Sequence, residues 1–246
     1  MKASFVFMAA LVLLTSTSAI AETYADDTFV PTNWSNYTIS SYSSNSMSYG
    51  YVQMDASFSG QGHFNGYMNV DNVWVYDPGT GMYRYDPGVV QLLVGFLQHD
   101  AVYTPSNQGA IVSMSWTYDA EGSVSGTGGG FFDWRPVVRQ NGSFFEYNGE
   151  HLYSNDGSLH AISLDGLSAK DFGWGSHPDF SKNGSQIEMG GIISGGCGPV
   201  SSCSSVSLSL DVDNWQVNIY DVPEPSTTGF LISSLIMLGL LRRSRP

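Results

Sequence analysis

Basic residues are scarce in this sequence. Lysine and arginine total 9 against 22 aspartates and glutamates, which gives a formal net charge of −13 at pH 7. Four of the basic residues (Lys2, Arg242, Arg243 and Arg245) lie at the two ends, so the segment between them is more acidic still. The negative electrostatic potential of such a protein repels nucleic acids and anionic lipid headgroups. We therefore expect no nucleic-acid partner, whereas cations, neutral glycans or simple solubility suit this charge.

Cysteine is nearly absent. The chain has 2 cysteines, Cys197 and Cys203, which flank a short Gly-Pro-Val-Ser-Ser segment. In an oxidising compartment this pair is typical of one disulfide that closes a small loop and fixes local geometry. A zinc pair has no neighbouring His or Cys to complete it, and the spacing differs from the C-x-x-C of redox proteins.

Long amphipathic helices are also missing from the middle of the chain, where short alternating segments occur instead. Val112, Met114, Trp116 and Tyr118 alternate with small polar residues, as do the apolar residues of 206–212. This period of two predicts strands with one dry face and one wet face. The phase changes at Asp213-Asn214, which predicts a tight turn or a bulge.

Turn signals separate these segments, among them several Asp-Pro-Gly, Asn-Gly and Asp-Gly sequences. Many short strands divided by such turns favour an all-β fold, an antiparallel β-sandwich or jelly roll. Residues 89–97 form an almost continuous apolar run that fits a strand or a short helix, and we favour a strand. We expect one sandwich domain over residues 22–221, between a signal helix at 1–21 and a hydrophobic helix within 222–246.

Catalytic motifs are not found. There is no G-x-S-x-G nucleophile elbow, and the five histidines have no metal-ligand spacing such as H-E-x-x-H. Glycoside hydrolysis needs two carboxylates across a cleft, for which Glu146, Glu150 and Glu188 are candidates. Acidic residues are abundant here, so we expect a non-enzymatic protein, with a glycan-degrading enzyme as the alternative.

Large aromatic residues beside glycines suggest carbohydrate binding, because exposed rings stack on the apolar faces of sugars. Trp134 and Trp174 are the candidates, whereas Trp74, Trp116 and Trp215 lie in alternating segments and are expected in the core. No cofactor is expected. A structural calcium ion is an open alternative, since Ca²⁺ prefers oxygen ligands. Its candidate ligands are Asp71, Asp77, Asp211 and Asp213.

The N-terminus has the features of a secretory signal. Lys2 supplies a positive charge, residues 5–14 are apolar, and small residues follow up to the A-x-A pattern of Ala19 and Ala21. We expect signal peptidase to cleave after Ala21. The apolar run is short for a membrane span.

The C-terminus combines three elements in a fixed order. Pro223, Glu224 and Pro225 form an extended Pro-Glu-Pro motif, residues 229–241 are apolar, and Arg242, Arg243 and Arg245 close the chain. The apolar stretch is at the short end for a membrane helix, and the arginines would lie on the cytoplasmic side. This arrangement resembles the PEP-CTERM sorting signal, and the resemblance is confined to residues 222–246.

The resemblance implies an export route. In PEP-CTERM proteins an exosortase recognises the motif, which implies cleavage near Pro225 after a transient insertion into the inner membrane. It also implies a Gram-negative producer of exopolysaccharide, and a final place at the outer surface or in the extracellular matrix. We therefore predict a matrix or surface protein that binds exopolysaccharide. A passive surface-coat protein and an unprocessed C-terminal anchor remain open alternatives.

Overall fold

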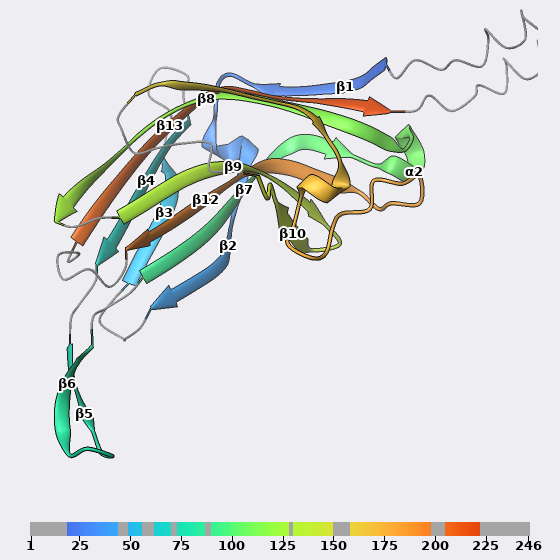
Figure 1. Cartoon of the computed structure of the whole chain (residues 1–246). Helices are drawn as coiled ribbons and strands as arrows, with labels where there is room; N and C mark the ends of the chain where they lie inside the picture. Colours follow the sequence, from blue (N-terminus) through green and yellow to red (C-terminus); the bar gives the residue numbers. More distant parts are fainter. Residues whose placement is uncertain are drawn as a thin grey trace, which may run out of the picture.

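The computed structural model describes residues 19–43, 49–55, 62–69, 73–86, 90–127, 130–149, 158–197 and 205–221 (Figure 1). These residues form two antiparallel sheets packed face to face, together with one separate hairpin. The predicted all-β antiparallel sandwich is confirmed. None of the helices in this described part is long and apolar enough to cross a membrane.

The larger sheet has six strands, in the order β11-β8-β13-β4-β3, with β1 also paired to β13. Its members are β1 (Ala19–Asp26), β3 (Tyr49–Asp55), β4 (Gly62–Asn69), β8 (Ile111–Thr127), β11 (His160–Leu167) and β13 (Ser205–Asp221). The long strand β13 pairs with β4 over its first half and with β1 over its second half. Ala19 lies opposite Asp221, so the two ends of the described chain lie side by side.

The smaller sheet has five strands, in the order β10-β9-β12-β7-β2. They are β2 (Trp34–Ser43), β7 (Val90–Tyr103), β9 (Gly130–Gln140), β10 (Ser143–Glu146) and β12 (Ile187–Cys197). This sheet curls strongly, because Tyr37 and Phe144 from its two opposite edge strands meet with ring centroids 5.4 Å apart. Residues 90–97 of the predicted apolar run lie in β7, which confirms the strand prediction for them.

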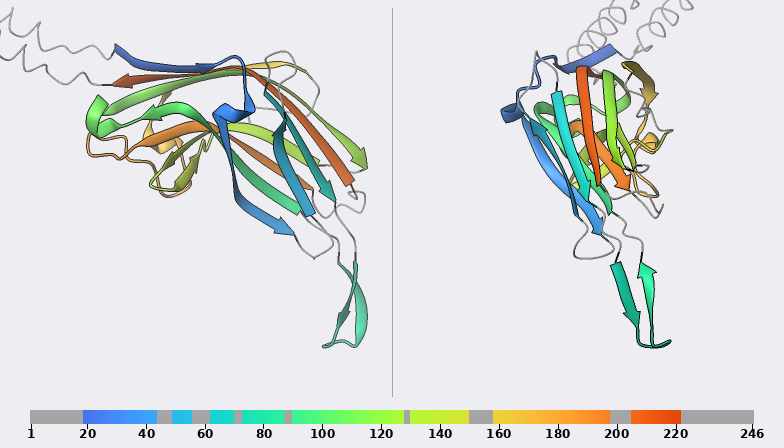
Figure 2. Two further views of the ribbon diagram at one scale, coloured as in Figure 1. Left: turned by 180° about the vertical axis from the view of Figure 1, so that it is seen from behind. Right: turned by 90° about the vertical axis from the view of Figure 1, so that its left-hand side faces the viewer.

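Strands β5 (Val73–Asp77) and β6 (Met82–Asp86) pair only with each other. They form a hairpin that projects from the sandwich, and all the views in Figures 1 and 2 show it clear of the two sheets. Trp74, which was expected in the core, lies on β5 of this projecting hairpin. Three short helices complete the described elements: η1 (Pro31–Asn33), α2 (Pro105–Gln108) and η2 (Ala169–Asp171).

The core lies between the two sheets and is rich in aromatic rings. Met114, Trp116 and Tyr118 of β8 are fully buried, as the alternation predicted. Val112 is 47% exposed, against expectation. The register of β8 with β13 shifts between Tyr220 and Asp221, and Ile111 is buried instead of Val112.

The phase change at Asp213-Asn214 is a bulge within one continuous strand. The pairing of β13 with β8 shifts between Asp213 and Gln216, and Asn214 adopts a positive φ of 51°. Trp215 is buried after the bulge, as predicted. A turn, the other predicted explanation, is wrong at this point because β13 does not reverse direction.

Several predictions concern residues outside the described ranges. These residues include most of the predicted signal peptide, the whole sorting signal with Pro223, Glu224, Pro225 and its arginines, and Cys203 of the predicted disulfide. Cys197 ends β12. At the predicted signal cleavage site, the pairing of β1 with β13 skips Ala21 and continues from Glu22.

Candidate functional site

The segment after η2 presents a large exposed aromatic ring. Phe172 is fully buried and packs against Trp116, with ring centroids 6.2 Å apart. The next side chain, Trp174, is 69% exposed. The glycines on either side of it, Gly173 and Gly175, have φ values of +81° and +91°, which residues with a Cβ rarely adopt. The chain therefore anchors one ring in the core and turns the next ring out to solvent.

Hydrogen bonds to β10 and to the residues after it hold this loop in place. The amide of Gly173 donates to the carbonyl of Glu146 (2.7 Å), and the amide of Asn148 donates to the carbonyl of Asp171 (2.9 Å). The side-chain amide of Asn148 donates to the carbonyls of Gly173 (3.1 Å) and Lys170 (3.0 Å). The backbone that carries Trp174 is thus fixed on both sides of the loop.

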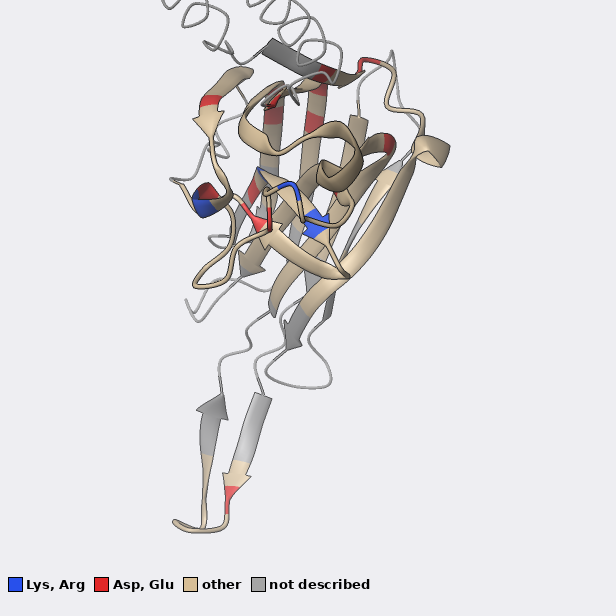
Figure 3. Ribbon diagram, turned by 90° about the vertical axis from the view of Figure 1, so that its right-hand side faces the viewer, with Lys and Arg blue, Asp and Glu red and all other residues tan. Residues whose placement is uncertain are grey.

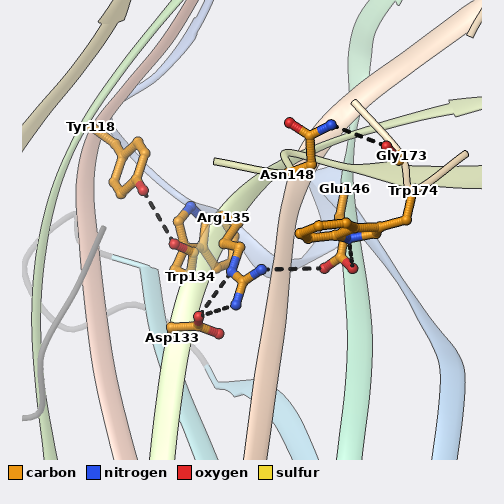
Figure 4. Close-up of polar contacts among 8 residues, drawn as sticks. All are labelled: Tyr118, Asp133, Trp134, Arg135, Glu146, Asn148, Gly173 and Trp174. Atoms are coloured by element: carbon orange, nitrogen blue, oxygen red, sulfur yellow. Dashed lines mark hydrogen bonds and ion pairs between the residues drawn. The ribbon is translucent and has the colours of Figure 1, made fainter. Parts of the chain in front are cut away.

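The side chain of Trp174 is oriented by a chain of charged groups, shown in Figure 4. Its indole N–H donates to Glu146 Oε1 (3.0 Å), and Glu146 Oε2 lies 3.9 Å from Arg135 Nη1. Arg135 in turn donates through Nε and Nη2 to Asp133 Oδ2 (2.8 and 2.7 Å). Arg135 and Asp133 are almost completely buried. The exposed indole is therefore linked, through Glu146, to a buried ion pair. We call Trp174, Glu146, Arg135 and Asp133 the Trp174 platform.

A buried tyrosine lies behind the platform. The hydroxyl of Tyr118 donates to the carbonyl of Trp134 (3.2 Å). Burial, followed by the nearby charge of Asp133, raises the pKa of Tyr118 well above its usual range. Tyr118 therefore stays neutral and serves as a hydrogen-bond donor inside the sandwich.

The prediction that Trp134 binds sugar is wrong. Trp134 is fully buried, with its ring against Phe64 (centroids 4.9 Å apart) and Phe96 (6.3 Å). It lies on β9, where its side chain points into the core while Asp133 and Arg135 point to the opposite face. The exposure expected for Trp174 is confirmed, so one of the two predicted aromatic residues is available to a ligand.

Glu146 and Glu188, two of the three candidate acids, have different partners. Glu146 belongs to the Trp174 platform, Glu188 on β12 accepts a hydrogen bond from Arg139 (3.0 Å), and Glu150 lies outside the described residues. Glu146 and Glu188 lie on two strands of the same sheet with β9 between them. The structure thus gives each of these two carboxylates its own arginine partner.

The proposed calcium ligands are also separated. Asp77 lies on the projecting hairpin, whereas Asp211 and Asp213 lie on β13, and Asp71 is outside the described ranges. Asp211 Oδ1 lies 2.5 Å from His63 Nδ1. Within the described ranges, no group of three or more His, Cys, Asp or Glu side chains is placed to hold a metal ion. Asp77 therefore lies on a different element from Asp211 and Asp213, and the calcium site stays a prediction.

The sequence analysis did not predict a cluster of aromatic and charged side chains on the smaller sheet. Arg139 lies 4.7 Å from the ring centroid of Tyr37 and 5.5 Å from that of Phe144, and it also pairs with Glu188. These residues come from β9, β2, β10 and β12, which the curl of the sheet brings together. No local spacing in the sequence predicts such a cluster, because its members lie far apart along the chain.

No protein-family model and no curated protein matches this chain. Among solved structures it is similar to a family 11 carbohydrate-binding module from Clostridium thermocellum, in complex with a β-1,3-1,4-mixed-linked tetrasaccharide. The identity is 13% and the TM-score 0.37, over 81% of this chain and 96% of that one. The CBM22-1 xylan-binding domain of Paenibacillus barcinonensis Xyn10C is 9% identical, with a TM-score of 0.28 over 84% and 98% of the two chains. These TM-scores are too low to align individual residues, and the fold is defined by the strand order given above.

Proposed function

We propose that the protein is an exported, non-enzymatic surface or matrix protein that binds polysaccharide at the Trp174 platform. The observation that carries this proposal is the side chain of Trp174, which is 69% exposed and is held by its indole N–H on Glu146. A large ring at such exposure contributes little to the core, and its fixed orientation lowers the conformational entropy lost on binding.

The chemistry of the platform favours a sugar. The exposed ring offers an apolar face for the C–H face of a pyranose, while Asn148 and the surrounding backbone offer hydrogen-bonding groups at the edge. Asp133, Arg135 and Glu146 together bring two acids and one base to the site. With a net charge of −13 for the chain, this composition favours neutral glycans over uronic-acid polymers.

Cosedimentation of residues 22–222 with polysaccharide tests the proposal. We expect retention by the producer's own exopolysaccharide or by a neutral polymer from a panel of mixed-linkage β-glucan and galactomannan. Trp174→Ala should weaken binding at least tenfold, about 1.4 kcal/mol, because the stacking surface is removed. Leu159→Ala, which truncates another exposed apolar side chain, should leave binding unchanged. Equal retention of wild type and Trp174→Ala would contradict the proposed site.

Amide substitution separates a positioning role of Glu146 from a catalytic role. In Glu146→Gln the side-chain oxygen still accepts from the Trp174 indole, so binding should change by less than threefold. Release of reducing sugar that disappears in Glu146→Gln or Glu188→Gln would instead support the glycan-degrading enzyme. Failure of every polymer to be retained, with and without EDTA, would leave the passive surface-coat protein.

Export and sorting are proposed from the two ends of the sequence. The signal-like residues 1–21 and the Pro-Glu-Pro, apolar and arginine segments of 222–246 support processing by signal peptidase and an exosortase. We predict that the protein isolated from its native host begins at Glu22 and ends near Pro225. Mass spectrometry of both termini checks this, and a mature chain that still carries Arg242 to Arg245 would contradict exosortase cleavage.

A further inference from the structure

The hairpin of β5 and β6 (Val73–Asp86), here called the hairpin arm, has a well-defined tip. Asp77 Oδ1 accepts from the amide of Gly79 (2.8 Å), and the carbonyl of Asp77 accepts from the amide of Gly81 (2.8 Å). Gly81 has a φ of +70°, as this turn requires. Tyr76 pairs with Tyr83 across the two strands, one residue pair away from the turn.

The tip exposes apolar surface that no described part of the chain covers. Tyr76 is 52% exposed, and Tyr83 and Met82 are each 67% exposed. The two tyrosine rings meet edge to face, with centroids 5.4 Å apart, so ring faces remain open to solvent. An isolated two-stranded hairpin is marginally stable in water, and concentrated exposed aromatic surface marks a contact site. The hairpin arm therefore has the features of a binding element.

A second tyrosine pair, with one exposed ring, lies on β3 and β4, the strand pair next to the hairpin arm. Tyr51 of β3 is opposite Tyr67 of β4, with ring centroids 6.3 Å apart, and Tyr51 is 50% exposed. Strand β4 leads directly into the hairpin arm, with residues 70–72 between them. Exposed tyrosine rings on both β3 and the hairpin arm suit an extended ligand better than a compact one.

Charge identifies the kind of ligand. The hairpin arm carries three charged residues (Asp77, Arg84 and Asp86) with a formal net charge of −1, while the body carries many acids (Figure 3). A second copy of the chain would bring another net charge of −13, and anionic lipid is repelled in the same way. A neutral polysaccharide meets no such repulsion, and its rings stack on tyrosines while its hydroxyls bond the phenolic groups.

The hairpin arm and the Trp174 platform lie far apart. Figures 1 and 2 show the hairpin arm at one end of the sandwich and β10, which holds the Trp174 loop, toward the other end. We propose that the hairpin arm is a second polysaccharide-binding element and that one protein molecule bridges two polysaccharide chains. This inference rests on the proposed function of the Trp174 platform. Two separated weak sites on one chain also give avidity on a polymer without any additional contact.

A two-step capture experiment tests bridging. Beads coated with the polysaccharide that retains the wild type are loaded with the protein, washed, and offered the same polysaccharide in fluorescent, soluble form. We expect the wild type to capture the fluorescent polymer. The double variant Tyr76→Ala/Tyr83→Ala should stay on the beads through the Trp174 platform but capture at least tenfold less. Trp174→Ala should lose capture to a similar extent.

Two controls identify the ligand of the hairpin arm. Leu159→Ala truncates an exposed apolar side chain outside both sites and should leave capture within twofold of the wild type. Light scattering should show the wild type and the tyrosine variant as the same monomer.

Full capture by the tyrosine variant would overturn the inference and leave the proposed function standing. A dimer that dissociates in the tyrosine variant would show a protein contact instead. If no polymer retains the wild type, the proposed function fails and the bridging inference fails with it.

Discussion

Replacing Trp134 with alanine is expected to lower the free energy of unfolding by about 3–5 kcal/mol. The indole is fully buried between the two sheets and contacts the rings of Phe64 and Phe96. It also lies directly over the backbone of β12, because a Cβ added at Gly191 would overlap Trp134 Cζ2. The substitution therefore opens a cavity lined by rigid strands, which cannot collapse to fill it.

Trp134→Phe and Trp174→Ala provide matched comparisons. The indole N–H of Trp134 has no hydrogen-bond partner within the described part of the chain, so phenylalanine loses volume but no hydrogen bond. We expect Trp134→Phe to cost less than half as much as Trp134→Ala, and Trp174→Ala to change stability by about 0.5 kcal/mol or less. Urea denaturation followed by circular dichroism measures all three. A Trp134→Ala variant as stable as the wild type would show that the core is not packed as described.

The exposure of Trp134 and Trp174 was only partly predictable from the sequence. Both lie in glycine-containing, aromatic segments, and the sequence alone did not distinguish them. Trp134 lies between Asp133 and Arg135, which are buried on the opposite face of β9 and pair with each other there. Trp174 lies between two glycines with positive φ, and its exposure follows from that local backbone.

Strand positions were predictable where one face of the strand is buried and the other is exposed to solvent. The alternation in 206–212 and 114–118 placed those residues in β13 and β8, and the phase change marked the bulge near Asn214. The order of the strands and the curl of the smaller sheet depend on pairings between distant segments, which no local pattern contains. The projecting hairpin was missed for the opposite reason, because its alternation is the same as that of a core strand.

In the candidate site, too, single residues were predictable from the sequence but the contact between them was not. Glu146 and Trp174 were each predicted to be functional, one for catalysis and one for sugar binding, without any link between them. They meet because the loop after η2 pairs with the residues of β10, through the Gly173 amide and the Glu146 carbonyl. This contact changes the role inferred for Glu146, from a catalytic acid to a group that orients an aromatic ring.

Asp26 is a structural carboxylate that the sequence did not indicate. It is 7% exposed and accepts four hydrogen bonds. Its Oδ1 accepts from the amides of Thr28 and Phe29 and from the hydroxyl of Thr28, and its Oδ2 accepts from the indole of Trp34 (all 2.8–2.9 Å). These bonds hold Phe29 at a φ of 44°, with its ring stacked on Trp34. Asp26 thus fixes the connection between β1 of one sheet and β2 of the other.

Hydrogen bonding makes this connection sensitive to acid. Burial alone would raise the pKa of Asp26, but the four hydrogen bonds outweigh burial and hold its pKa below the usual value. In the window between the two pKa values, the unfolded chain binds more protons than the folded chain, so stability rises with pH there. The contribution of Asp26 is complete above the unfolded pKa of about 3.9, and it is lost as the pH falls through the lower folded value.

We expect Asp26→Ala to lower the free energy of unfolding at pH 7 by about 3 kcal/mol or more, because four donors, two of them buried, lose their charged acceptor. Asp26→Asn keeps the shape but not the charge, so its stability difference from the wild type should be largest at neutral pH and should shrink below pH 4. Urea denaturation of the wild type and both variants from pH 2 to pH 7 measures this, with Asp165→Asn as an exposed control. If the wild-type and Asp26→Asn curves stay parallel over the whole range, the Asp26 charge does not stabilise the fold. If they converge in acid while Asp165→Asn follows the wild type, the acid sensitivity belongs to the connection between the two sheets.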